Sequence, residues 1–104
     1  MADVPKIIKN LRYIQNANYN GPVTAQPTFH RTNFDRLQGS AQQVADILSQ
    51  NPNPNRDQKE NLRAQFQAIG KAAELYCGED MGKIDILKAF QAASGEWELL
   101  DSEG

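Results

Sequence analysis

The segment NPNPN, residues 51–55, is the feature that most restricts how this chain can fold. Each proline lacks a backbone N–H and pushes the residue before it out of the helical conformation, so a helix must end here. On both sides, apolar residues recur at alternating spacings of three and four, which is typical of a helix with one buried face. These residues are Phe34, Leu37, Ala41, Val44 and Leu48 before the segment, and Leu62, Phe66, Ile69, Ala73 and Tyr76 after it. Because so short a connection forces its two helices to pack together, the pattern predicts a central antiparallel helical hairpin.

Capping residues predict where the two helices of the hairpin begin and end. Thr32 or Asn33 is the expected cap of the first helix, and Asp35 suits the positive end of its dipole. Asn55 is the expected cap of the second helix, because its side chain can accept a hydrogen bond from the first turn. Gly78 is the expected C-terminal stop of the second helix.

Two further helices are predicted to flank the hairpin. Asp3 is expected to cap an N-terminal helix with Pro5 in its first turn, and the Asn-rich run at 16–21 is expected to end that helix. Asp80 is expected to cap a short fourth helix, which Ser94-Gly95 would close.

A chain of 104 residues has room for one hydrophobic core, so residues 1–104 are predicted to form a single all-α domain of four helices. Such a core is thin, and we therefore expect a homodimer through the heptad-like helix faces rather than a monomer. The acidic C-terminal segment 96–104 could be a flexible tail, could dock through Trp97 in a basic-rimmed groove of a partner, or could fold back on the domain. We prefer the last, because an exposed Trp97 would reduce solubility.

Side chains that could support catalysis or bind a metal are sparse. The single histidine, His30, and the single cysteine, Cys77, are too few for a zinc site. Cys77 also lies at the expected C-terminal end of a helix, where the dipole disfavours the reactive thiolate. We therefore expect no metal, no cofactor and no enzymatic activity. No apolar run is long enough for a membrane span, and a lone cysteine fits a reducing compartment, so we expect a cytoplasmic protein without membrane contact.

Residues 18–32 form a long stretch without a predicted helix, and they include Pro22 and Pro27. Connections of this length are uncommon in compact domains unless they are functional or disordered. The two prolines and neighbouring β-branched residues favour an extended conformation, which suits pairing with the edge of a partner. Whether the segment is ordered before binding stays open.

Aromatic and cationic side chains cluster around this extended segment, and these residue types dominate the energetics of protein interfaces. The residues expected to contact a protein partner are Tyr19, Phe29, His30, Arg31, Arg36 and Trp97. Amide-rich helix faces, which include Gln42 and Gln43, also suit an interface. The favoured function is a non-catalytic protein-binding protein, namely an adaptor, an assembly factor or an inhibitor of a larger complex. Its small size also fits an accessory protein of a phage or mobile element.

The alternative function is binding of a nucleic acid or nucleotide by the N-terminal third of the chain. The net charge is −2, but the chain through Gln50 carries more lysine and arginine residues than acids. A positive groove combined with aromatic stacking is typical of proteins that bind single strands. The residues expected to act in this way are the cations Lys6, Lys9, Arg12 and Arg31, with Tyr19, Phe29 and His30 for stacking. We expect this less than protein binding, and catalysis least of all.

Overall fold

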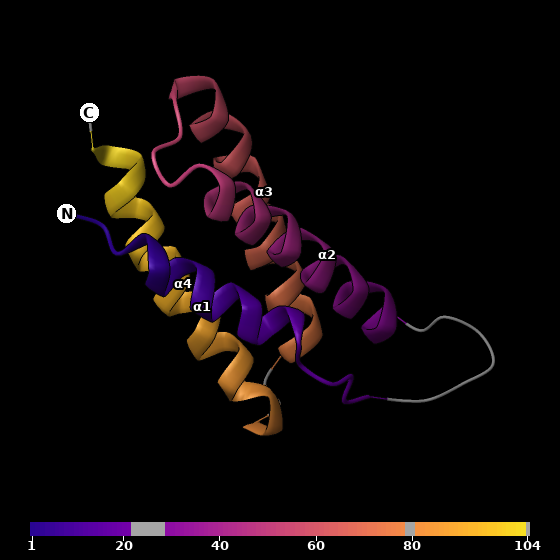
Figure 1. The fold of residues 1–104 in the computed structure, drawn as a ribbon. Helices are drawn as coiled ribbons and strands as arrows, with labels where there is room; N and C mark the ends of the chain where they lie inside the picture. The colour runs from indigo at the N-terminus through magenta and orange to yellow at the C-terminus, as the bar shows by residue number, and fades with distance from the viewer. Residues whose placement is uncertain (22–28, 79–80, 104) are drawn as a thin grey trace.

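The computed structural model describes residues 1–21, 29–78 and 81–103, and these residues form helices and connections without a strand (Figure 1). The elements are α1 (Val4–Gln15), α2 (Phe29–Gln50), α3 (Arg56–Cys77), the 3-10 turn η1 (Met81–Lys83) and α4 (Ile84–Ser102). The prediction of an all-α architecture with four helices is confirmed.

Each α-helix packs against two others, so that the four surround a common core (Figure 1). α1 contacts α2 and α4, and α3 contacts the same two helices from the other side. The largest fully buried side chains come from the first three helices, and include Ile7, Leu11, Leu37, Leu48, Leu62, Ile69 and Tyr76. Burial of an apolar side chain of this size stabilises the fold by about 1.5–3 kcal/mol. The heptad-like faces of α2 and α3 are buried in this core, so they are not available as a homodimer interface.

Local capping chemistry fixes the start of α1 and both ends of α3. The Asp3 side chain accepts a hydrogen bond from the Lys6 N–H at 3.0 Å. Asn55 and Gln58 form a reciprocal capping box, in which each side chain accepts from the other residue's N–H at 2.9 Å. Gly78 ends α3 with a φ of 51°, a conformation that favours glycine. The predicted caps of these two helices are confirmed.

α2 begins at Phe29, so the prediction that Thr32 or Asn33 caps this helix is wrong. Asn33 lies within the helix and is buried, and its Nδ2 donates to the Phe29 carbonyl at 2.9 Å. Packing explains the earlier start, because the ring of His30 contacts Tyr76 of α3 from within the first turn of α2. Such tertiary contacts outweigh the weak preference of Asn and Thr for a cap.

The expected extended segment 18–32 is described only at its two ends. Residues 18–21 are non-helical, whereas 29–32 are helical, so the prediction of an extended conformation is wrong for the second end. The intervening residues 22–28, with both prolines, lie outside the described residues.

α4 continues to Ser102, so the predicted end at Ser94-Gly95 is wrong. Trp97 is only 4% exposed and stacks on Phe66 of α3, with ring centroids 5.0 Å apart and an interplanar angle of 9°. A glycine inside a helix costs about 1 kcal/mol, which is less than burial of Trp97 and Leu100 contributes. The segment considered as a flexible tail is therefore helical through Ser102.

The start of α4 also differs from the sequence prediction. Asp80, the expected cap, lies outside the described residues, and Lys83 occupies the cap position without a side-chain capping bond. The 3-10 turn η1 leads directly into the helix and takes the place of such a cap.

A bidentate ion pair joins the end of α4 to α3. Arg63 Nε donates to Asp101 Oδ2 at 3.0 Å, and Arg63 Nη2 donates to Asp101 Oδ1 at 2.8 Å. These hydrogen bonds lower the pKa of Asp101 below its usual range and raise the pKa of Arg63. Because the folded-state pKa of Asp101 is lowered, this stabilisation is present at neutral pH and is lost as the pH falls through that pKa.

Changing Gly95→Ala is expected to raise the free energy of unfolding by about 0.5–1 kcal/mol, because alanine favours a helix interior. Gly95 is exposed within α4, and an added Cβ would meet nothing within 4 Å. Gly78→Ala is the contrasting variant and is expected to lower stability by about 1 kcal/mol, since its positive φ disfavours a side chain. Urea denaturation followed by circular dichroism measures both changes. A destabilised Gly95→Ala would contradict a continuous helix at this position.

Candidate functional site

An aromatic cluster lies at one end of the bundle, where the residues after α1, the first turn of α2 and the end of α3 meet. It consists of Tyr19, Phe29, His30, Phe34 and Tyr76. The ring centroids are 5.0 Å apart for Phe34 and Tyr76, and 5.4 Å apart for Tyr19 and Phe34. His30 lies 5.9 Å from Phe29 and 6.5 Å from Tyr76. These are separations at which aromatic pairs attract each other, so the cluster is a continuous packed unit.

Tyr76 holds this cluster together, and its side chain is fully buried. Its hydroxyl accepts from the Asn20 N–H at 2.7 Å and donates to the Asn20 carbonyl at 3.2 Å. Lys83, which is also buried, donates through Nζ to the Tyr76 carbonyl at 3.1 Å and lies 4.2 Å from the ring centroid. Tyr76 thereby connects the residues after α1 with α3 and the turn η1.

Arg31 brings a positive charge to the surface of the aromatic cluster. Its guanidinium carbon lies 4.9 Å from the ring centroid of Tyr19 and 5.8 Å from that of Phe34, within the range of cation–π attraction. Its Nε lies 3.3 Å from Asp35 Oδ1, one turn further along α2. About half of the Arg31 side chain stays exposed, so the charge is positioned and still accessible.

The exposed edge of the cluster is formed by Phe29 and His30. Phe29 is the first residue of α2 and contacts the ring of His30 edge to face, and 61% of it is exposed. The Nδ1 atom of His30 is buried and has no hydrogen-bond partner among the described residues. Leaving a buried polar atom without a partner costs about 1–3 kcal/mol, so a hydrogen bond to this nitrogen would stabilise this end of the bundle.

The remaining residues expected to contact a partner lie elsewhere. Trp97 lies on α4 and is almost fully buried against Phe66 of α3. Arg36 lies on α2, where it lines the groove described below. The structure thus brings Tyr19, Phe29 and His30 together with Arg31, and separates Trp97 from them.

The cations expected to bind nucleic acid are largely paired with acids. Lys6 Nζ lies 3.7 Å from Glu96 Oε1, and Arg12 Nη2 lies 2.8 Å from Asp46 Oδ1. Arg31 is paired with Asp35, as described above, whereas Lys9 is exposed. These acids reduce the positive potential that a phosphate backbone would meet.

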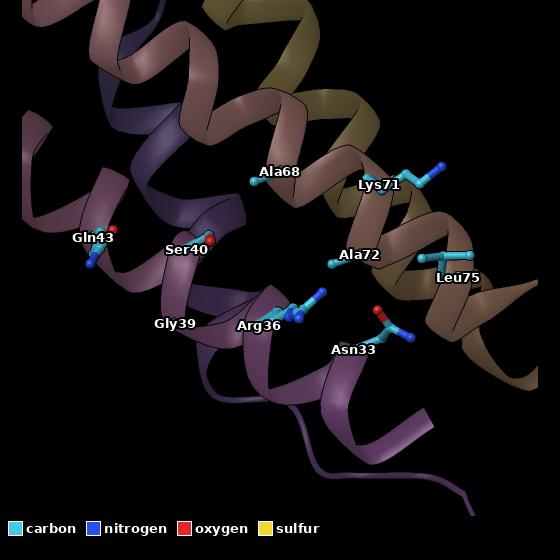
Figure 2. A pocket seen from close by; sticks show the side chains of 9 residues that line it. All are labelled: Asn33, Arg36, Gly39, Ser40, Gln43, Ala68, Lys71, Ala72 and Leu75. Carbon is cyan, nitrogen blue, oxygen red and sulfur yellow. The ribbon is translucent and has the colours of Figure 1, made fainter. Parts of the chain in front are cut away.

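A second candidate surface, which the sequence did not predict, is a groove between α2 and α3 with a volume of about 410 Å³ (Figure 2). Gly39 and Ser40 line it from α2, and Ala68 and Ala72 line it from α3. We call this surface the α2–α3 groove. The signal for it was the recurrence of small residues beside the core stripe of each helix, but their meaning depends on how the two helices are aligned.

The single cysteine lies inside the helical bundle. Cys77 is buried, and its Sγ donates to the Lys83 carbonyl at 3.7 Å. Within 1–21, 29–78 and 81–103, no three side chains of His, Cys, Asp or Glu gather closely enough to hold a metal ion. None of the helices in these ranges is long and apolar enough to cross a membrane.

Comparison of the chain with known protein families, with curated proteins and with solved structures gave no match.

Proposed function

We propose that this chain is a non-catalytic protein-binding protein, which occupies a surface of a larger protein complex as an adaptor, an assembly factor or an inhibitor. The observation that carries the proposal is the packed aromatic cluster around the first turn of α2, which has the exposed Phe29 at one edge and the cation of Arg31 over Tyr19. Aromatic residues and arginine dominate the binding energy of protein interfaces. A contact held in place by a helix loses little conformational entropy when it binds, which favours affinity.

His30 supports the same surface. Its ring contacts that of Phe29 edge to face and is only partly buried, so a partner that covers Phe29 would also contact His30. Tyr19 lies beneath Arg31 and fixes the position of its guanidinium group. The proposed contact therefore consists of Phe29, His30 and Arg31, with Tyr19 in support.

The proposal also includes the arrangement that the sequence predicts around this contact. The antiparallel hairpin of α2 and α3 is the platform that presents the contact. An accessory protein of a phage or mobile element, acting in the cytoplasm, is the biological class that we favour. A homodimer would need a surface other than the heptad-like faces, because these are buried in the core.

Binding of a nucleic acid or nucleotide is the less favoured function. Three of the four cations that it would use, Lys6, Arg12 and Arg31, are paired with acids. If this function were correct, oligonucleotide binding would weaken steeply as the salt concentration rises.

Affinity capture from the cell of origin, with the tagged full-length chain as bait, tests the proposed function. The double variant Phe29→Ala and Arg31→Ala is expected to weaken binding of a defined protein partner by about tenfold or more, as for other hot-spot residues. The matched control is Leu99→Ala, which removes another half-exposed apolar side chain on α4. Circular dichroism verifies that each variant is folded. Capture that the double variant leaves unchanged would contradict the proposed contact.

A further inference from the structure

The α2–α3 groove begins one turn beyond Phe29 and has the length of a short helix. Along α2 it runs from Asn33 to Gln43, which corresponds to about 15 Å at 1.5 Å per residue. Four of its nine lining residues have small side chains or none, namely Gly39, Ser40, Ala68 and Ala72 (Figure 2). Side-chain size sets how closely helices approach, so a lining of this kind admits the backbone of another helix at short distance.

Two positive charges flank the groove from opposite walls. Arg36 extends from α2 toward α3, and Lys71 projects from α3 (Figure 2). Neither side chain forms an ion pair or hydrogen bond with another residue in the described part of the chain. None of the residues that line the groove is acidic. The groove therefore carries two cations without an acidic partner in the described part of the chain, whereas Lys6 and Arg12 of α1 are paired with acids.

A side-chain acceptor at one end of the groove also has no partner within the described residues. Asn33 is only 3% exposed, and its Nδ2 donates to the Phe29 carbonyl at 2.9 Å. Only the amide nitrogen can donate this hydrogen bond, so the bond fixes which side-chain atom is nitrogen and which is the acceptor Oδ1. Figure 2 shows this oxygen pointing toward Ala72 across the groove. Within the described residues Oδ1 accepts no hydrogen bond, so it is available to a donor supplied from outside.

We infer that the α2–α3 groove docks an acidic amphipathic helix of the protein partner. About three turns of this helix would lie on the small side chains, its carboxylates would pair with Arg36 and Lys71, and a hydroxyl or amide group would donate to Asn33 Oδ1. The recognition mode is that of a helix in a groove. This inference rests on the proposed function and names the chemistry of its partner.

Charge complementarity favours a partner of different sequence over a second copy of this chain. Two copies joined through this groove would place Arg36 and Lys71 of one copy against the same two cations of the other. Like charges across an interface are strongly unfavourable, whereas carboxylates opposite both cations are attractive. An acidic helix is therefore the occupant that fits both the shape and the charge of the groove.

Two synthetic peptides of matched design test this inference. Both have an alanine-rich helical sequence of about five turns, and the positions beside the apolar face carry glutamate in one and lysine in the other. Each is titrated at low salt into the isotopically labelled full-length chain while backbone amide resonances are recorded. The glutamate peptide is expected to shift the resonances of residues 33–43 and 68–75, and the lysine peptide is expected to leave them unchanged. Added salt should weaken the interaction, because the two cations are exposed.

Two sets of variants locate the binding site of the glutamate peptide. Gly39→Leu fills the groove, and an added Cβ at this position meets nothing within 4 Å, so the variant should fold. We expect binding to weaken about tenfold, which corresponds to the loss of a well-packed contact. Gly95→Leu, at an exposed glycine of α4 with equal space around it, is the matched control and should bind normally. The charge variant Arg36→Glu with Lys71→Glu should lose at least about tenfold in affinity.

The charge variant has a matched control in Lys9→Glu with Lys88→Glu, which makes the same change of charge at exposed positions elsewhere. The inference is overturned if the glutamate peptide leaves the groove resonances unchanged, if both peptides act alike, or if the controls lose as much affinity as the groove variants. Concentration-dependent self-association that Gly39→Leu abolishes would also overturn it, because the groove would then bind a second copy.

The same variants separate failure of this inference from failure of the proposed function. Partner capture that depends on Phe29 but is unchanged in Gly39→Leu overturns the groove inference alone. Absence of any captured protein, while the glutamate peptide still binds the groove, overturns the proposed function and leaves the groove as a binding site for acidic helices.

Discussion

Replacing Trp97 by alanine is expected to lower the free energy of unfolding by about 3–5 kcal/mol, as for other buried aromatic side chains. The indole ring is almost fully buried and stacks in parallel on Phe66, so the variant loses both burial and an aromatic pair. A domain of this size is stable by only about 5–15 kcal/mol in total, so the variant would lose a large part of its stability. Urea denaturation followed by circular dichroism measures the change.

Leu99→Ala provides the control for this prediction. Leu99 lies two residues further along α4 and is 51% exposed, so its truncation is expected to change stability by less than about 0.5 kcal/mol. Deletion of 96–104 should destabilise at least as much as Trp97→Ala, because it also removes Leu100 and the ion pair of Asp101. Equal stability of the Trp97 and Leu99 variants would contradict docking of the C-terminal segment on α3.

Sequence alone predicted the helix boundaries that depend on neighbouring residues. The capping box of Asn55 and Gln58 involves residues three apart, and both partners can be recognised in the sequence. The same applies to Asp3 with the first turn of α1, and to Gly78, whose positive φ is a local property. These boundaries were predictable because their energetics do not require knowledge of the tertiary packing.

The boundaries that the sequence did not predict depend on residues far apart in the chain. α2 begins early because the side chains of its first turn pack on Tyr76, which lies more than forty residues later. α4 continues beyond Gly95 because Trp97 packs on Phe66 of α3. Local preferences of about 1 kcal/mol point to the opposite conclusion in both places, and burial of aromatic rings outweighs them.

The candidate site divides in the same way. Tyr19, Phe29 and Arg31 lie close in the sequence, so the sequence could predict that they meet in one region. It could not predict that Tyr76, from the far end of α3, packs among them. The α2–α3 groove was missed because it requires the alignment of two helices. Asn33, interpreted as a cap, lies within α2 at the end of that groove. A polar residue next to an amphipathic stripe can therefore be a helix cap or a residue inside the helix, and only the packing of the neighbouring helix distinguishes the two.

Tyr76 is the residue whose loss would most disturb the aromatic cluster. Tyr76→Ala is expected to lower the free energy of unfolding by about 3–5 kcal/mol, since it removes a fully buried ring that contacts Tyr19, His30 and Phe34. Tyr76→Phe keeps the ring and removes only the hydroxyl, and the expected cost is about 1 kcal/mol for the hydrogen bonds to Asn20. Urea denaturation measures both values.

The two variants of Tyr76 also separate the ring from its hydroxyl in the proposed function. In Tyr76→Phe the amide hydrogen of Asn20 loses its acceptor, so it should exchange faster with solvent while the amides of the core helices stay protected. Phe29 and Arg31 keep their support on the rings of His30, Tyr19 and Phe34, so partner capture should persist in this variant. If Tyr76→Phe destabilises as much as Tyr76→Ala, the hydrogen bonds to Asn20 rather than ring packing stabilise this end of the bundle, and the contact presented by α2 depends on the segment that follows α1.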